Sequence, residues 1–120
     1  MKTVTRQVGR VVVLDVSGRI TLGEGNVMLR EIVSDLAEKG NTNIVLNLGE
    51  VVYVDSSGVG ELVKAHATIR NKGGVLKLAN LNKRVHDLLQ MTRLSSVFDI
   101  EKDEASALKS FGVNASEGVA

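Results

Sequence analysis

The sequence contains no cysteine, and this absence excludes several kinds of site. Disulfides, thiolate nucleophiles and thiolate metal ligands all require cysteine. Proline is also absent, so the turns must be made by other residues, chiefly by the 12 glycines. The two histidines and the scattered acidic residues show no spacing typical of a metal site. We therefore expect neither a bound metal nor a cofactor.

Aromatic residues are scarce as well, with one tyrosine, two phenylalanines and no tryptophan. Proteins that stack nucleic-acid bases usually carry more aromatic surface. The 15 basic and 14 acidic residues give a net charge of +1, which provides no basic excess for nucleic acid or an anionic membrane. No apolar run approaches the roughly 18 residues of a membrane-spanning helix, and the N-terminus does not resemble a signal peptide. The prediction is a cytoplasmic protein that binds neither nucleic acid nor membrane.

The length of 120 residues and the 43% share of hydrophobic residues suit a single domain with one core. Short runs rich in β-branched residues predict strands, and apolar residues spaced three and four apart predict amphipathic helices. The predicted strands lie at residues 4–7, 11–16, 43–48, 75–80 and within 95–100. The predicted helices lie at about 26–39 and 58–71, after the capping residue Asn82, and near 105–111.

The resulting order of elements, ββαβαβαβα, predicts an α/β fold. Strands that alternate with helices imply crossover connections, and hence a mixed, mostly parallel sheet flanked by about four helices. We expect a single domain at residues 1–112, followed by a loose C-terminal tail at 113–120.

The N-terminal part of the chain predicts a β-hairpin that reverses at Val8–Arg10. Its second strand is nearly all β-branched, which is typical of a strand covered on both faces. This strand is expected to close at Ser17–Arg19, and residues 20–26 are expected to form a loop. The pair Gly49–Glu50 is expected to end the third strand.

The most informative stretch is Val54-Asp55-Ser56-Ser57-Gly58, where an apolar run stops before a helical pattern begins. The free N–H groups at a helix start favour acidic and hydroxyl side chains, so this composition is typical of a helix cap. A cap requires only one such residue, which leaves a serine to spare. Its hydroxyl could cap the helix, act as a nucleophile or accept a phosphate.

Nucleophilic catalysis is poorly supported by the sequence. A Gly-x-Ser-x-Gly elbow would need glycine where Val54 stands, and a catalytic triad also needs a histidine as base. His66 falls on the apolar face of its predicted helix, where a structural role is expected, and His86 is expected to be solvated. No phosphate-binding loop motif occurs. We therefore expect no enzymatic activity.

Phosphorylation remains open on chemical grounds. A phosphate on Ser56 would add about −1.5 to −2 charges at the helix start, beside the carboxylate of Asp55. If this surface docks a partner, the phosphate would oppose binding through repulsion and desolvation. The residues permit this role without requiring it.

Three segments resemble the bacterial anti-sigma factor antagonists, which are single STAS domains. They are Ile-Val-Leu-Asn-Leu at 44–48, Val-Asp-Ser-Ser-Gly-Val-Gly at 54–60 and Lys-Gly-Gly-Val-Leu at 72–76. The second segment, placed after such a strand, is the most specific of the three. The resemblance extends from Val11 to about Phe111, and the predicted order of elements also looks like the fold of that family.

The resemblance implies a phosphorylation-controlled partner switch. An unphosphorylated antagonist binds a serine-kinase anti-sigma factor and thereby frees the sigma factor. The kinase inactivates it by phosphorylating the serine that follows the aspartate, and a PP2C-type phosphatase restores it. By this motif Ser56 is the implied phosphorylation site, and Asp55, Ser57 and Gly58 lie with it in the implied partner-binding surface. The missing side chain of Gly58 is expected to let a partner approach the backbone closely.

One position departs from the family pattern. Family members often carry an acid shortly after the turn that follows the second strand, whereas this chain has Thr21 there. We include Thr21 in the predicted partner-binding surface, where its difference points to a different subset of partners. The alternative is a scaffold module in a larger signalling complex, in which Asp55–Gly58 only starts a helix. Whether the chain forms a homodimer stays open.

Overall fold

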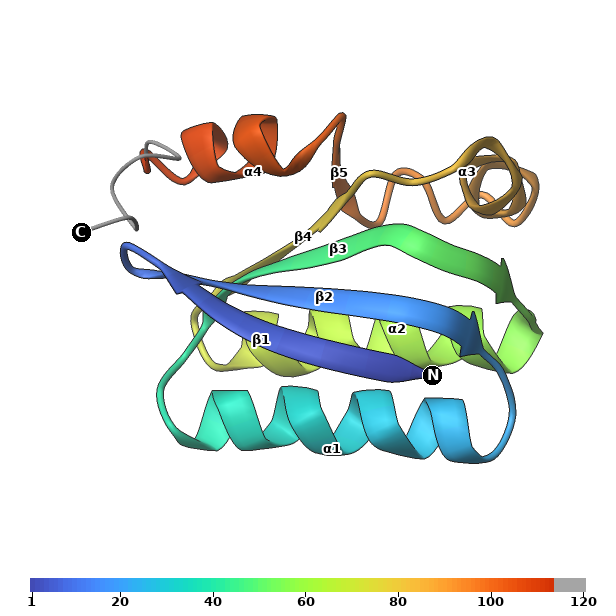
Figure 1. The fold of residues 1–120 in the computed structure, drawn as a ribbon, viewed down its shortest axis with the longest axis horizontal. Helices are drawn as coiled ribbons and strands as arrows, with labels where there is room; N and C mark the ends of the chain where they lie inside the picture. Colours follow the sequence, from blue (N-terminus) through green and yellow to red (C-terminus); the bar gives the residue numbers. More distant parts are fainter. Residues whose placement is uncertain (114–120) are drawn as a thin grey trace.

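The computed structural model describes residues 1–113 of the chain. Within this range, five strands and four helices follow one another in the predicted order (Figure 1). The strands are β1 (Lys2–Val8), β2 (Val11–Ile20), β3 (Asn43–Val54), β4 (Val75–Ala79) and β5 (Asp99–Glu101). The helices are α1 (Glu24–Glu38), α2 (Ser56–Asn71), α3 (Lys83–Met91) and α4 (Glu104–Ser110).

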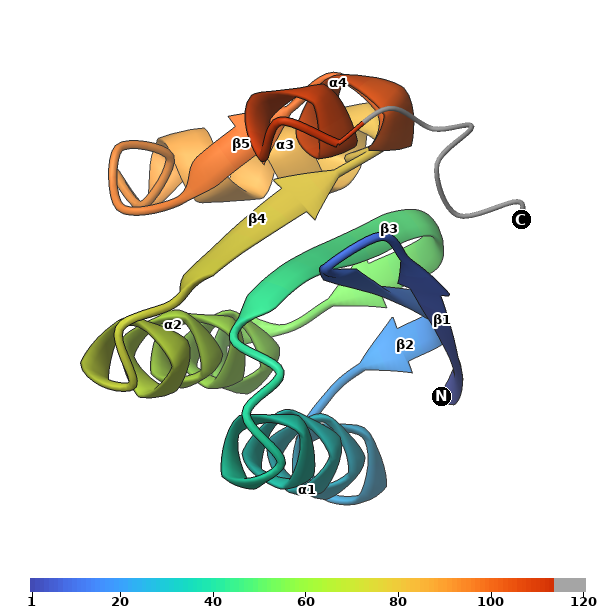
Figure 2. The same cartoon turned by 90° about the vertical axis from the view of Figure 1, so that its left-hand side faces the viewer.

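The strands form one sheet in the order β1-β2-β3-β4-β5. Strand β1 pairs antiparallel with β2, and the other neighbouring strands pair parallel. Helices α1 and α2 lie side by side under one face of the sheet, and α3 and α4 lie toward the other side (Figures 1 and 2). The predicted α/β fold, with its mostly parallel sheet and N-terminal hairpin, is confirmed.

The N-terminal hairpin turns through Gly9 and Arg10, as the sequence predicts. Gly9 has a φ of 58°, a left-handed conformation that costs glycine little. The residues Val11–Leu14 of β2 are at most 2% exposed, because α1 and α2 cover one face of the strand and α4 covers the other. The prediction of a strand covered on both faces is confirmed.

Two neighbouring strands extend further than predicted, both at the same edge of the sheet. Strand β2 does not close at Ser17–Arg19 but continues to Ile20, with irregular pairing on the way. Strand β3 is not interrupted at Gly49–Glu50 and runs on to Val54. The two extensions pair with each other, and this long-range pairing outweighs the local preference of glycine for turns.

Two helix starts were also predicted too late. Helix α1 begins at Glu24, inside the predicted loop at 20–26, after Gly23 at the N-cap position. Helix α2 begins at Ser56 rather than at Gly58, because the side chain of the preceding aspartate caps it. In α1 the glycine of the first turn, Gly25, was read as a loop residue, and in α2 the two serines before Gly58 were left outside the helix.

Two apolar clusters form the core. The larger cluster joins the central strands to α1, α2 and α3, and the smaller lies under α4. Val113, the first residue of the predicted tail, is 2% exposed and belongs to the smaller cluster. Residues 114–120 of that tail lie outside the described residues. Among residues 1–113, no helix has the length and apolar character needed to cross a bilayer.

The first turn of α2 rests directly on the end of β2. Gly58 in this turn is buried, and a Cβ added to it would lie 2.1 Å from the carbonyl oxygen of Ile20 and 2.9 Å from Cγ1 of Val54. The N–H of Asp55 donates to the same Ile20 carbonyl at 3.3 Å. Glycine therefore allows the turn after β3 to approach β2 at this position.

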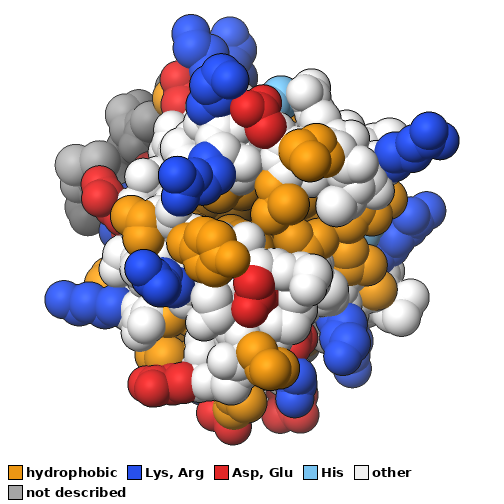
Figure 3. All heavy atoms as spheres, turned by 90° about the vertical axis from the view of Figure 1, so that its right-hand side faces the viewer, with side chains coloured by type: hydrophobic (Ala, Val, Ile, Leu, Met, Phe, Trp, Pro, Cys, Tyr) orange, Lys and Arg blue, Asp and Glu red, His pale blue; other side chains and the backbone are white. Residues whose placement is uncertain are grey.

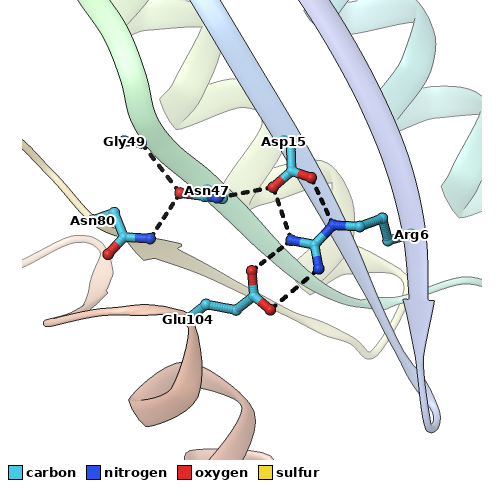
Figure 4. A network of polar contacts seen from close by, with 6 residues as sticks. All are labelled: Arg6, Asp15, Asn47, Gly49, Asn80 and Glu104. Carbon is cyan, nitrogen blue, oxygen red and sulfur yellow. Dashed lines mark hydrogen bonds and ion pairs between the residues drawn. The ribbon is translucent and has the colours of Figure 1, made fainter. Parts of the chain in front are cut away.

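A network of polar side chains crosses the sheet on the face that α4 covers (Figure 4). Arg6 on β1 donates to both carboxylate oxygens of Asp15 on β2, at 2.6 and 2.9 Å, and also to both oxygens of Glu104 at the start of α4. Asn47 on β3 donates to Asp15 and accepts from Asn80 after β4, each at 2.8 Å. The network thus links three strands, the segment after β4 and helix α4.

Within the network, the Arg6 guanidinium lowers the pKa of the Asp15 carboxyl. The hydrogen bond from Asn47 acts in the same direction, while partial burial opposes it. Asp15 is consequently ionised in the folded protein at neutral pH.

We expect Asp15→Asn to lower the free energy of unfolding at neutral pH by about 1 kcal/mol, because a partly exposed Arg6 loses one of its two ionic partners and keeps only Glu104. Because the pKa of Asp15 is lower in the folded than in the unfolded state, the stabilisation is complete above the unfolded value of about 4. It is lost as the pH falls through the folded value, so the difference between wild type and variant should shrink below about pH 4. Urea unfolding at a series of pH values measures this, and a pH-independent difference would contradict it.

Two glycines in α2 provide a matched pair for the packing of this helix on β2. Gly58→Ala should lower the free energy of unfolding by about 2–3 kcal/mol, because the new methyl group meets backbone that cannot move aside easily. Gly60 is exposed, and a Cβ there meets no heavy atom within 4 Å. Gly60→Ala should therefore raise the stability by roughly 0.5–1 kcal/mol. Equal effects of the two substitutions in urea unfolding would refute this account.

Candidate functional site

The side chain of Asp55 organises the turn between β3 and α2. It is the N-cap of α2, and its Oδ1 accepts hydrogen bonds from the Gly58 N–H at 2.7 Å and from the Ser57 hydroxyl at 2.6 Å. Its Oδ2 accepts from the N–H of Leu22 at 3.1 Å. These bonds, above all that from Ser57, lower the pKa of Asp55, so the carboxyl is ionised at neutral pH.

The two adjacent serines occupy different environments. Ser57 is half-buried and its hydroxyl donates to Asp55. Ser56 is exposed at the first position of α2, and its hydroxyl makes no hydrogen bond with any of residues 1–113. Capping is therefore performed by the aspartate rather than by a serine. The spare hydroxyl that the sequence indicates is that of Ser56.

The loop that carries Thr21 lies beside this turn, although the two are far apart in the sequence. The bond from Leu22 to Asp55 joins them, and the Thr21 carbonyl accepts from the N–H of Asn26 at 3.1 Å. For Gly58 the structure gives a reason for glycine within the chain itself. This residue is buried, and the backbone that approaches it is that of Ile20 in the same chain rather than that of a partner.

A groove of about 780 Å³ opens beside Ser56, between the β3–α2 turn and helix α3. The residues that line it are Tyr53, Val54, Asp55, Ser56, Lys83, Arg84, Val85, Asp87, Leu88 and Met91. Figure 3 looks onto this end of the molecule, where hydrophobic side chains gather in and around a hollow. The sequence indicated the apolar and charged faces of α3, but no local signal places this helix next to Ser56.

The histidines do not contribute to the groove. His66 is half-buried, and its ring meets that of Phe98 edge to face, with ring centres 5.7 Å apart, which confirms the predicted structural role. His86 is half-buried rather than solvated, because one side of its short helix packs on the core. Neither residue lines the groove with Ser56. Among residues 1–113, no cluster of three or more His, Cys, Asp or Glu side chains could hold a metal ion.

Comparison with known proteins gives consistent results for sequence and structure. A family model described as the STAS domain matches residues 2–107. The anti-sigma-B factor antagonist of Bacillus subtilis is 36% identical over 87 residues, which cover 72% of this chain and 78% of that protein.

Solved structures of similar proteins share the fold. The crystal structure of a candidate anti-sigma factor antagonist from Thermotoga maritima, 26% identical, has a TM-score of 0.84 and covers 90% of this chain and 92% of that one. Bacillus SpoIIAA in its phosphorylated form, 21% identical, has a TM-score of 0.71, covering 92% of this chain and 99% of that one. The family model spans most of the chain, and the sequence relative is one of the antagonists. The chain therefore belongs to the STAS domain family, among the anti-sigma factor antagonists.

Proposed function

We propose that this protein is an anti-sigma factor antagonist that binds a serine-kinase anti-sigma factor and is released from it when Ser56 is phosphorylated. A PP2C-type phosphatase then restores the binding form. The observation that carries the proposal is the contrast between the two serines. The hydroxyl of Ser57 is committed to the aspartate, whereas that of Ser56 is exposed at a groove suited to a partner.

The chemistry belongs to the partners rather than to this chain. The Ser56 oxygen attacks the γ-phosphorus of ATP held by the kinase, the bond to the ADP oxygen breaks, and the hydroxyl proton passes to a base of the kinase. Water later displaces the serine oxygen from phosphorus in the phosphatase, releasing inorganic phosphate. Neither histidine of this chain lies at the groove to act as the base, which supports a protein that works by binding. Because the reaction uses ATP, we place it in the cytoplasm.

The proposed partner-binding surface is built around the turn. It comprises Asp55, Ser56 and Ser57, together with the loop of Thr21, which the Leu22–Asp55 bond holds beside them. Leu22 is 79% exposed, so this loop also offers an apolar contact. A phosphate on Ser56 would stand beside an ionised aspartate on this surface and would repel an anionic or apolar partner surface. The helix start itself tolerates the negative charge.

Ser56→Ala should leave the free energy of unfolding nearly unchanged, because the lost hydroxyl is exposed and makes no hydrogen bond within the described chain. The variant should take up no phosphate and should stay bound to the kinase. Intact-mass measurement with site mapping, on protein from its own cells, tests phosphate uptake, and urea unfolding tests stability.

Ser57→Ala is the matched control for this experiment. It removes the hydrogen bond to Asp55 and should cost about 0.5–1.5 kcal/mol of stability, yet it should still become phosphorylated at Ser56. If Ser56→Ala unfolds, Ser56 is chiefly structural and the proposal fails. If wild-type protein never carries phosphate at Ser56 in any growth state while it elutes in a large complex, a scaffold function replaces the switch.

Ser56→Asp should imitate the released form, because it places a negative charge at the first position of α2. The helix N-terminus favours an anion there, so the thermal stability should stay equal to or slightly above that of wild type. Affinity for the kinase, measured by calorimetry, should fall. The decrease should reach at least part of the decrease that phosphorylation causes. Unchanged affinity would contradict control by charge at this position.

A further inference from the structure

The charges around the groove are unevenly compensated. Of the two acidic residues that line it, Asp87 pairs with Lys83 at 3.2 Å, whereas Asp55 accepts hydrogen bonds from neutral groups of its own turn and of the Leu22 loop and keeps its negative charge. Arg84 is exposed, and no carboxylate of residues 1–113 pairs with it. The outward-facing charge on this rim of the groove is therefore positive.

A second cation stands next to the groove, on the ring of a residue that lines it. The guanidinium of Arg19 lies over the ring of Tyr53, 5.7 Å from its centre, and Tyr53 itself lines the groove. Arg19 is exposed, and among residues 1–113 it has no ion-pair partner. A stacked guanidinium is held in place by the ring while its N–H groups stay available to a carboxylate.

Much of the remaining lining of the groove is apolar. Its lining includes Val85 and Leu88 from α3, and two large apolar side chains remain open to solvent, Tyr53 at 40% and Met91 at 81% exposure. In Figure 3 hydrophobic side chains form the hollow of this face, and Lys and Arg side chains stand around it. An exposed apolar hollow with polar surroundings is typical of a protein-binding surface, and methionine adapts to varied side chains there.

We infer that this groove binds an acidic segment of the partner that carries an apolar side chain. The apolar side chain would enter between α3 and the β3–α2 turn, and flanking carboxylates would pair with Arg84 and Arg19. Charge complementarity at the rim argues for this occupant over a basic one. The inference rests on the proposed function, because the segment is assigned to the proposed kinase partner.

A phosphate on Ser56 would change the charge of this groove. Ser56 lines the groove together with Arg84. Three cations and two carboxylates stand at the groove, the ionised Asp55 among them, which gives a local charge of +1. A phosphate contributes about −1.5 to −2 charges, which is enough to make this local charge negative. An acidic segment would then lose its electrostatic partners and meet an anion of its own sign. Phosphorylation thus ends binding by cancelling the positive charge of the groove.

Two synthetic peptides test the charge preference directly. One has two central leucines flanked on each side by two glutamates, and the other has lysines in place of the glutamates, both with capped ends. In NMR titrations of isotope-labelled full-length protein, the acidic peptide should shift the amide resonances of Tyr53, Ser56 and Leu88 and bind more tightly than the basic one. Its affinity should fall as ionic strength rises.

Charge-reversal variants locate the effect. Arg84→Glu and Ser56→Asp should each weaken binding of the acidic peptide by about threefold or more, as expected for surface charge pairs. Lys109→Glu at the end of α4 alters the net charge by the same amount as Arg84→Glu, is at an exposed residue as well and lies away from the groove. It should leave the affinity unchanged.

Equal binding of the two peptides, equal effects of Arg84→Glu and Lys109→Glu, or no shift of groove resonances would each overturn the inference. None of these results bears on whether Ser56 is phosphorylated, which the mass measurement decides separately. If Ser56 is phosphorylated and controls kinase binding while the acidic and basic peptides bind the groove equally well, the proposed function stands and the inference fails. If the peptide results hold but Ser56 is never phosphorylated, the groove binds acidic segments without this switch.

Discussion

The carboxylate of Asp55 is hydrogen bonded to groups from two distant parts of the chain, Ser57 and Gly58 in α2 and Leu22 in the loop after β2. These bonds fix where α2 begins and where the β2–α1 loop lies. They also occupy the hydroxyl of Ser57, which leaves Ser56 as the exposed hydroxyl of the pair. The position of the candidate site and the choice between its two serines both follow from this one side chain.

Stability and the candidate site are located on different parts of the sheet. The network around Arg6 and Asp15 ties α4 to the hairpin, whereas Ser56 lies where β3 ends and α2 begins. In parallel sheets the carboxyl ends of strands are the usual place for binding, because the connecting loops there are open to solvent. A modification at Ser56 therefore leaves the polar network in place. This separation suits a proposed switch that changes the surface while the fold persists.

The small net charge of the whole chain conceals the local charge of the groove. Fifteen basic and fourteen acidic residues nearly cancel, yet Arg84 and Arg19 at the groove have no ion-pair partner among residues 1–113. At physiological ionic strength charges interact over about 8 Å, so a docked partner senses the groove rather than the total. The charge of a single phosphate is large compared with the charge at the groove, although it is small compared with the number of charged residues in the whole chain.

Much of the fold follows from patterns between near neighbours in the sequence. The β-branched run in β2, the helical spacing in α2 and the turn at Gly9 each depend on local preferences, and all three were predicted correctly. The stretch from Asp55 to Gly58 likewise predicted a helix start in which one serine hydroxyl is not needed for the cap. Its resemblance to the antagonists implies Ser56 as the phosphorylation site, which stays a prediction.

Long-range contacts decided the rest. The ends of β2 and β3 pair with each other, so both strands continue past glycines that predict turns. Gly58 lies so close to the backbone of Ile20 that only glycine fits there. The groove exists because α3, a separate amphipathic segment, packs beside Ser56. Local sequence determines which segments can form and which chemical groups they carry. Which of those groups meet is set by the packing of residues far apart in the chain, and no pattern between neighbours encodes it.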